Sequence, residues 1–315
     1  MKWVYTSQRK EYANALVELG KTRTDVVVLD ADLSSSTRTV EFAKKFPERF
    51  FNCGIAEQNM MGTAAGLAAS GKVVFASTFA VFATGRCWDQ IRQSIAYPNL
   101  DVKIVATHAG ITVGGDGASH QALEDIGLMR SLPNLTVIVP ADGIEAYKAV
   151  KAVVDHCGPC YVRLGRADVP MLTSMDSEFI IGKATILREG SDVTLVGCGQ
   201  MVAACMDAAE ELHKRGVKAE VINMSTVKPL DEEVLLRSAE KTGAVVTAEE
   251  HSIATGLGSA VASVLGENLP TPMKMIGTPD CFGESGESEE LMRRYGLTAE
   301  RIALAAEEVI RRKKQ

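Results

Sequence analysis

The sequence lacks any long hydrophobic run and any strong excess of basic charge. Its longest weakly polar stretch, Gly62 to Gly85, consists of small residues and is broken by Lys72, so it is not a membrane span. The formal net charge is -6. The one basic run, Arg311 to Lys314, is more typical of a solubilising helix end than of a nucleic-acid patch. We therefore expect neither a membrane nor a nucleic acid as a partner.

The sequence also lacks internal repeats, low-complexity segments and an apolar leader. Its first ten residues contain no apolar core, and we expect no signal peptide. Seven cysteines, an odd number, argue for reduced thiols and for the cytoplasm. The chain has 315 residues, of which 46% are hydrophobic and 23% charged, and this is enough for two globular domains.

Short β-branched runs alternate with helical patterns along the whole chain, which is typical of parallel α/β domains. We expect strands at 26–29, 72–76, 102–107, 135–139 and 161–164, and helices at 7–20, 79–97, 122–131 and 141–156. Residues 167–177, with Pro170, are the best linker candidate, and the α/β pattern restarts after them. We predict a first domain over residues 1–170, a linker over 171–190, and a second, smaller α/β domain over 191–315.

Glu57 lies in the first turn of a further predicted helix. It follows Phe50-Phe51-Asn52-Cys53-Gly54, where we expect the aromatic residues to end a buried strand and Gly54 to allow a turn. Small residues at 62, 65, 66 and 69 share one face of the helix and would let another backbone approach closely. A carboxylate at a helix start often only compensates the macrodipole. The alternative is a carboxylate held in a dry site to exchange a proton with a ligand.

Three loops rich in functional groups are expected at the carboxyl ends of strands, where parallel sheets bind ligands. They are the serine loop 30–37, the turn before Glu57, and the long loop 108–121. The last of these holds His108, Asp116 and His120 among four glycines. An ordinary glycine-rich surface loop remains the alternative for 108–121, but long loops often carry functional groups.

The motifs in these loops resemble those of the transketolase group of thiamine diphosphate enzymes. The segment Cys53-Gly54-Ile55-Ala56-Glu57-Gln58-Asn59-Met60 is similar to the group's glutamate motif. The run from His108 through Gly115-Asp116-Gly117 to His120-Gln121 resembles its pattern of histidine, Gly-x-Asp-Gly and His-Gln. The resemblance covers the whole chain. It implies a parallel-sheet domain of the pyrimidine-binding type, followed by a transketolase C-terminal α/β domain.

One part of the transketolase pattern is missing. A full transketolase begins with a domain that binds the cofactor's diphosphate through Mg2+, and this chain has no such segment. Gly115-Asp116-Gly117 follows the wrong strand for that motif and has no asparagine pair after it. The resemblance therefore implies the C-terminal subunit of a split transketolase. We expect an N-terminal partner subunit that carries Mg2+, no metal on this chain, and a heterotetramer that is active only when assembled.

The resemblance also implies roles for particular residues. Glu57 is expected to contact N1' of the cofactor's pyrimidine ring, and burial would raise the proton affinity of such a carboxyl group. Phe79 and Phe82 are expected to bind the cofactor, with Phe82 stacking on the pyrimidine. Transketolases often carry a tyrosine three residues further on, where this chain has Gly85, so this wall of the site departs from the family.

The expected reaction is transfer of a two-carbon ketol unit from a ketose phosphate to an aldose phosphate, as in pentose phosphate metabolism. Glu57, His108 and His120 are the catalytic candidates. By their family motifs, the substrate-binding candidates are Arg9, Ser36, His108, Asp116, His120 and Arg166. The motifs identify neither the sugars nor the substrate's anionic group, which we expect to be a phosphate.

Two other functions compete with this one: the β subunit of a 2-oxoacid dehydrogenase E1, and a non-catalytic transketolase-like subunit. The E1 subunit would not need the pattern from Asp116 to His120. The retention of Glu57 with both histidines counts against a non-catalytic role. The segment Cys157-Gly158-Pro159-Cys160 has thioredoxin spacing, but it follows a predicted helix instead of opening one, so we interpret it as structural.

Overall fold

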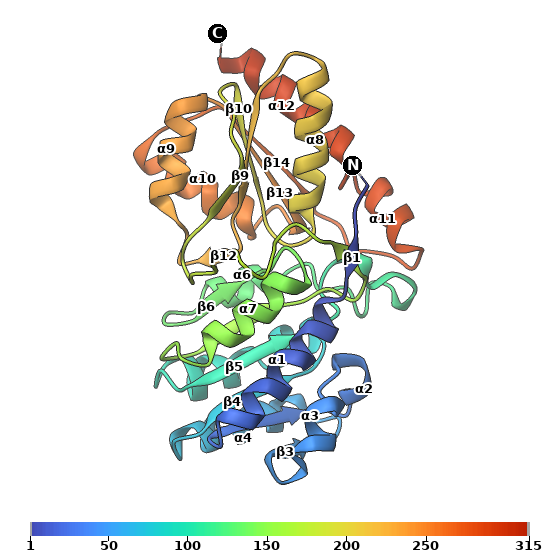
Figure 1. Ribbon diagram of the computed structural model, residues 1–315, viewed down its shortest axis with the longest axis vertical. Coiled ribbons are helices and arrows are strands. Elements are labelled where there is room, and N and C mark those ends of the chain that lie inside the picture. The colour runs from blue at the N-terminus through green and yellow to red at the C-terminus, as the bar shows by residue number, and fades with distance from the viewer. Residues whose placement is uncertain (1, 314–315) are drawn as a thin grey trace.

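The computed structural model describes residues 2–313, and these fold around two sheets that lie one above the other along the long axis (Figure 1). Met1, Lys314 and Gln315 lie outside the described residues, and with them the last basic residue of the run 311–314. Within residues 2–313, no helix is long and apolar enough to cross a membrane. The α/β class predicted from the sequence is confirmed.

The first sheet has seven strands in the order β12-β6-β7-β5-β4-β2-β3, parallel except for β12. A separate antiparallel pair joins β1 to β8. The strands of the N-terminal half are β1 (Tyr5–Thr6), β2 (Val26–Asp30), β3 (Phe50–Asn52), β4 (Val73–Ser77), β5 (Val102–Ala106), β6 (Thr136–Ile138), β7 (Cys160–Arg163) and β8 (Val169–Pro170). The helices are α1 (Gln8–Thr22), α2 (Ser34–Thr37), α3 (Val40–Lys45), α4 (Glu57–Ala69), α5 (Trp88–Gln90), α6 (Asp125–Arg130) and α7 (Gly143–Val153).

The second sheet has five strands in the order β14-β13-β10-β11-β9, parallel except for β9. The strands of the C-terminal half are β9 (Thr185–Arg188), β10 (Val193–Gly197), β11 (Ala219–Asn223), β12 (Thr226–Lys228), β13 (Val245–Ser252) and β14 (Met273–Thr278). The helices are α8 (Met201–Lys214), α9 (Glu232–Thr242), α10 (Leu257–Asn268), α11 (Ser288–Arg294) and α12 (Ala299–Lys313).

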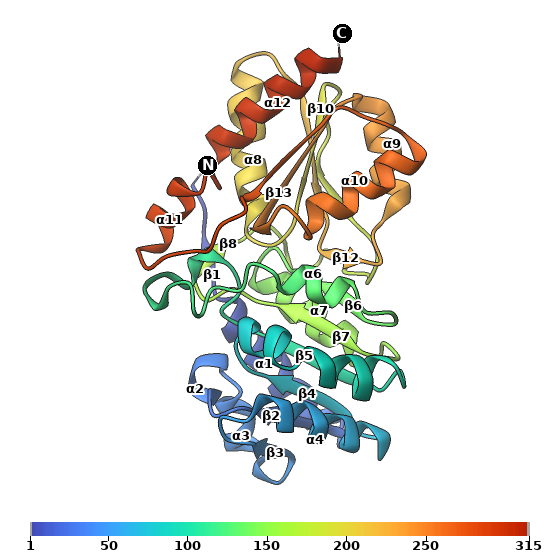
Figure 2. The same ribbon diagram turned by 180° about the vertical axis from the view of Figure 1, so that it is seen from behind.

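Helices cover both faces of the first sheet, and this explains why its central strands are apolar throughout. Figure 1 shows α1 and α7 in front of the sheet, and Figure 2, seen from the opposite side, shows α4 on the other face. Every residue of β2, β4 and β5 is buried. Such a sheet presents no solvent face, so its strands read as continuous hydrophobic runs.

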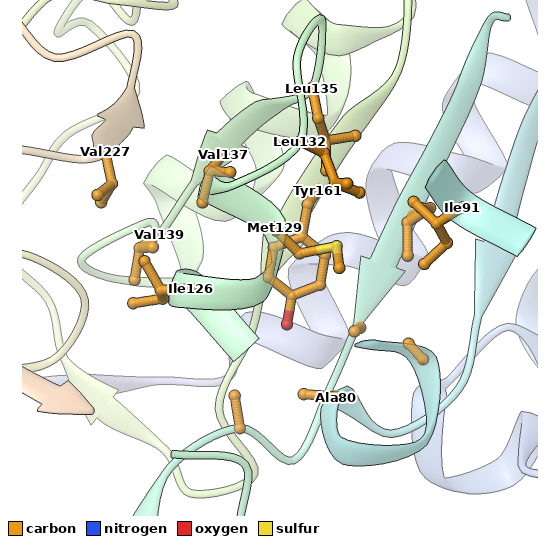
Figure 3. Packing of buried hydrophobic residues seen from close by; sticks show 14 of the residues in the cluster. Ala80, Ile91, Ile126, Met129, Leu132, Leu135, Val137, Val139, Tyr161 and Val227 are labelled. Atoms are coloured by element: carbon orange, nitrogen blue, oxygen red, sulfur yellow. The ribbon is translucent and has the colours of Figure 1, made fainter. Parts of the chain in front are cut away.

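Strand β12 belongs to the C-terminal half of the sequence but completes the sheet of the N-terminal half. It pairs antiparallel with β6, Thr226 opposite Ile138. Val227 lies in the same buried cluster as Val137 and Val139 (Figure 3). The two halves therefore share one hydrophobic core at their junction.

Three local predictions were wrong. Phe50 and Phe51 begin β3, which is an edge strand and not a buried one because it pairs only with β2; Phe51 is 42% exposed. Residues 34–37 of the serine loop form a helical turn. The long helix expected over 79–97 is broken into two π-helical segments, η2 (Phe82–Arg86) and η3 (Ile91–Ala96), which flank the short α5.

Candidate active site

The predicted site residues gather at the carboxyl edge of the first sheet. Five neighbouring strands, β3, β2, β4, β5 and β7, end at this edge, and the chain leaves each of them through a segment that carries candidates. The first turn of α1 adds Arg9. This is the edge at which open parallel sheets bind ligands.

Glu57 is the first residue of α4 and is only 3% exposed. Both of its carboxylate oxygens lie 2.9 Å from Nη1 of Arg86, which donates to them. A helix N-terminus favours a negative charge. Burial and ion pairing, however, distinguish Glu57 from an ordinary solvent-facing acid at a helix start. The carboxylate is dry, oriented and charge-compensated.

An aromatic wall is linked to this carboxylate through Arg86, whose guanidinium carbon lies 4.5 Å from the ring centre of Phe82. The rings of Phe79 and Phe82 are 5.9 Å apart and inclined by only 16°. The imidazole of His108 stacks on the ring of Phe79, with centroids 3.7 Å apart. His120 meets Phe82 edge-on at 5.3 Å. The loop 108–121 therefore closes against the segment that carries the two phenylalanines.

His108 is held as a neutral imidazole. It is 3% exposed, and its backbone has a positive φ of 58°. Burial lowers the pKa of His108 to about 3, and the nearby charges of Arg9, Arg166 and His120 act in the same direction. Its Nδ1 lies 2.8 Å from the hydroxyl of Thr107. At neutral pH the ring offers one donor or acceptor without adding charge.

Four candidates form a charged rim beside the histidines. Arg9 donates to the main-chain carbonyls of Ser36 and Arg166, each at 2.9 Å. Arg166 lies 3.9 Å from Asp116. The pKa of Arg9 is lowered by burial first and then by the positive charges of Arg38 and Arg166. Cations gathered in this way favour an anionic ligand.

The second domain supports the loop that carries the histidines. Glu250 on β13 accepts a hydrogen bond of 2.7 Å from the N–H of Thr112. At Gly110, where φ is 85°, a Cβ atom would lie 2.3 Å from the carboxyl carbon of Glu250. Only glycine fits there, because the loop passes directly against this carboxylate. The C-terminal half thus shapes a site whose candidate residues all come from the N-terminal half.

Arg86 is a site residue that the sequence analysis missed. It follows Gly85, the position at which the chain departs from the transketolase pattern, and that departure was the available signal. Arg38, which lies close enough to lower the pKa of Arg9, was also missed. Its position two residues after Ser36 carries no motif.

The Cys157–Cys160 segment does not have the features of a redox site. All seven cysteines are free thiols. Cys160 begins strand β7, and burial raises the pKa of its thiol to about 11, whereas a reactive cysteine needs a lowered pKa. Within residues 2–313, no group of three or more His, Cys, Asp or Glu side chains is arranged to hold a metal ion.

Comparison with known proteins gives the family. Residues 5–171 match the transketolase pyrimidine-binding domain, and residues 182–302 match the transketolase C-terminal domain. A solved structure of a split-gene transketolase, an inactive β4 tetramer, is 54% identical with a TM-score of 0.92, over 98% of this chain and 99% of that one.

Two further relatives are similar over nearly their whole length. The 6-deoxy-6-sulfo-D-fructose transketolase subunit SqwH of Clostridium sp. is 47% identical over 97% of this chain and 95% of its own. A subunit of the apulose-4-phosphate transketolase of Phocaeicola vulgatus is 39% identical over 96% of this chain and 97% of its own.

The chain therefore belongs to the transketolase family. Within that family, it is the C-terminal subunit of a split, two-subunit transketolase, as its motifs predict. The matches favour this function over the β subunit of a 2-oxoacid dehydrogenase. Membership of the pyrimidine-binding family implies that the chain binds thiamine diphosphate.

Proposed function

We propose that this chain supplies the pyrimidine half of a shared thiamine diphosphate site and transfers a two-carbon ketol unit from a ketose phosphate to an aldose phosphate. When bound, thiamine diphosphate supplies the nucleophilic carbon that carries the two-carbon unit. The observation that carries the proposal is a buried carboxylate, Glu57, linked through Arg86 to an aromatic wall. A heteroaromatic ring with protonated nitrogen needs both: an acceptor in a dry site and a flat apolar surface.

The donor set fits the pyrimidine ring. With the cofactor bound, Glu57 would hydrogen-bond the ring nitrogen N1', and Phe79 and Phe82 would exclude water from one side of the ring. The neutral imidazole of His108 and the ring of His120 hydrogen-bond the oxygens of the sugar. Asp116 accepts a hydrogen bond from a substrate hydroxyl.

Arg9 and Arg166 bind the anionic group of the substrate at the charged rim. Planar guanidinium groups suit the oxygens of a phosphate. Ser36 contributes its hydroxyl to the same anion, while its carbonyl holds Arg9 in place. Two relatives act, by their names, on a sulfonated sugar and on a sugar phosphate. The shared chemistry of these substrates is a sugar with a terminal anionic group, and we propose a phosphate here, as in pentose phosphate metabolism.

We also propose an obligate complex in the cytoplasm, with two copies of each chain. The N-terminal partner subunit binds the diphosphate and Mg2+. Gly62, Gly66 and Ala69 on the outward face of α4 are exposed, as a face that a partner covers would be in the single chain. The related β4 tetramer, which is inactive, supports the need for a partner. The free state of all seven cysteines favours a reducing compartment.

The substitution Glu57→Gln tests this function. It keeps the size of the side chain but removes the carboxylate, and we expect the assembled complex to lose ~10²–10⁴-fold in turnover, the usual contribution of general acid–base assistance. Turnover is measured with thiamine diphosphate, Mg2+ and a ketose–aldose pair. Glu41→Gln is the matched control, because Glu41 also lies in the first turn of a helix, α3, but on the surface. Turnover of Glu57→Gln within a factor of two of wild type would return Glu57 to a helix-dipole role.

A further inference from the structure

The segment that begins at Phe82 of the aromatic wall is wound as a π-helix. In η2 (Phe82–Arg86) the backbone makes a wider turn than an α-helix, a feature that often occurs at functional sites. Gly85 leaves one wall position without a side chain, and no atom lies within 4 Å of where its Cβ would be. Arg86, the next residue, is the last of this π-helical segment.

Three contacts fix Arg86 there. Its guanidinium carbon lies 4.5 Å from the ring centre of Phe82, so the cation rests on the aromatic face. Its main-chain carbonyl accepts a 2.9 Å hydrogen bond from Nε2 of Gln58, the neighbour of Glu57. Its Nη1 donates to both oxygens of Glu57, each at 2.9 Å. One side chain therefore joins the carboxylate to the ring on which the cofactor is proposed to stack.

The geometry of the ion pair leaves Glu57 able to accept a further hydrogen bond. A carboxylate has about four acceptor positions, and a single arginine nitrogen shared between both oxygens occupies two of them. Ionising a carboxylate in a dry site is costly unless a cation lies beside it. Arg86 offsets that cost while its side chain stays 48% exposed, compared with 4% for Glu57. The arginine thus supports the carboxylate from the solvent side without covering it.

We propose that Arg86 is a positioning residue of the cofactor site: it holds Glu57 as an oriented carboxylate and, stacked on Phe82, replaces the wall that Gly85 lacks. This inference rests on the proposed function, because it assigns Glu57 to the pyrimidine ring. It adds a residue that the family motifs of the sequence do not mark. It also gives a physical reason for the extra width of the turn at residues 82–86.

Substitution of Arg86 separates this role from simple support of the fold. Arg86→Met keeps the length and loses the charge. A hydrogen bond to a charged group contributes about 1.5–3 kcal/mol, so we expect the affinity of the assembled complex for thiamine diphosphate with Mg2+ to fall about ten- to a hundredfold. Arg86→Lys should retain most of the affinity, because both contacts to Glu57 come from one nitrogen that a lysine can imitate. Affinity is measured by titration calorimetry, independently of turnover.

Arg92→Met is the matched control. Arg92 lies on the next π-helical segment, is exposed, and rests on Trp88 at 6.0 Å, without touching Glu57. We expect the complex with Arg92→Met to bind thiamine diphosphate with the affinity of wild type. The melting temperatures of all isolated variants, measured first, show that the chain still folds.

A double-mutant cycle decides the mechanism. If Arg86 acts through Glu57, Arg86→Met should weaken cofactor binding less than twofold in a Glu57→Gln background. An undiminished loss in that background overturns the proposal, as does unchanged or tighter binding by Arg86→Met alone. Tighter binding would mean that Arg86 blocks the site. If Glu57→Gln retains wild-type turnover, the proposed function itself fails; if it loses turnover while Arg86→Met binds normally, only the role of Arg86 fails.

Discussion

The arginines of the charged rim hydrogen-bond main-chain carbonyl groups in addition to supplying positive charge. Arg9 donates to the carbonyls of Ser36 and Arg166, and Arg166 donates to the carbonyl of Val113. The sequence motifs placed Arg9, Ser36 and Arg166 in one site although they are far apart in the chain. They did not predict that the carbonyl of Ser36 would be the group that contacts Arg9, because main-chain contacts leave no residue-specific signal.

Arg166→Ala measures how far this rim recognises charge. The loss of one charged hydrogen bond should raise KM for a phosphorylated substrate about ten- to a hundredfold, with kcat nearly unchanged, because the anion is bound alike in the ground and transition states. A non-phosphorylated substrate should show little change. Arg215→Ala is the control. The side chain of Arg215 is 44% exposed, compared with 43% for Arg166, and it pairs with Glu307 within the C-terminal half, away from the rim. An equal loss on both substrates would assign Arg166 a structural role.

The residue-level predictions that rest on side chains in a fixed motif named residues that the fold brings together. The structure places His108, His120, Phe79 and Phe82 in one aromatic cluster, in which His108 stacks on Phe79 and His120 meets Phe82 edge-on. The sequence analysis did not identify Arg86, because the contact of Arg86 with Glu57 depends on the wide turn of its helix. Periodicity analysis assumes 3.6 residues per turn and misplaces a side chain wherever the winding changes.

At the scale of elements, the hydrophobic pattern predicted the order of strands and helices along the chain. It did not predict where each strand lies in the sheet. The aromatic pair Phe50-Phe51 has strong strand propensity, and yet β3 lies at the sheet edge. Propensity describes a half-buried surface and does not distinguish a central strand from an edge strand. The turn at residues 34–37 forms because Asp30 accepts hydrogen bonds from the N–H of Leu33 and the hydroxyl of Thr37.

The junction of α6 with β13 predicts how stability depends on pH. His251 is buried, and its Nε2 accepts a hydrogen bond of 3.1 Å from the N–H of Ile126. Burial is the main cause that lowers the pKa of His251 to about 4. Above the unfolded value of 6.5 both states are neutral. Below pH 6.5, His251 becomes protonated in the unfolded chain but stays neutral in the native chain. The stability that His251 contributes is therefore lost as the pH falls from 6.5 towards 4.

Urea unfolding between pH 4.5 and 7.5 checks this sign. On acidification, the change in unfolding free energy of wild type should be more destabilising than that of His251→Gln over the same interval, because only wild type carries the contribution of His251. His213→Gln, which changes an exposed histidine in the last turn of α8, should keep the wild-type slope. Glu249, whose pKa is raised to about 7 by burial, contributes with the opposite sign in all three proteins. Equal slopes for His251→Gln and His213→Gln would contradict the account.

At the scale of the whole molecule, the two halves are joined more closely than the sequence suggests. Strand β12 crosses from the second half into the first sheet, and Glu250 of β13 braces the loop that bears His108. Arg163 of β7 also donates to the carbonyl of Glu250 at 2.9 Å. Such contacts between distant segments are set by tertiary packing, so local pattern could not predict them. The boundaries at residues 170 and 190 remain predictions.

The candidate residues of this chain form one side of a site, at an edge of a sheet whose neighbouring helix α4 has an exposed face of small residues. In the proposed function, a carboxylate and an aromatic wall bind the pyrimidine ring, and a cationic rim binds the substrate. The proposed function assigns the diphosphate and Mg2+ to the N-terminal partner subunit.

Titration of the purified chain with a separately purified N-terminal subunit tests this claim most directly. Ketol transfer is measured at fixed thiamine diphosphate, Mg2+ and substrates. We expect no turnover without the N-terminal subunit, and a rise to a plateau at equal numbers of the two chains. Robust turnover by the isolated chain, with no N-terminal subunit present, would contradict the account.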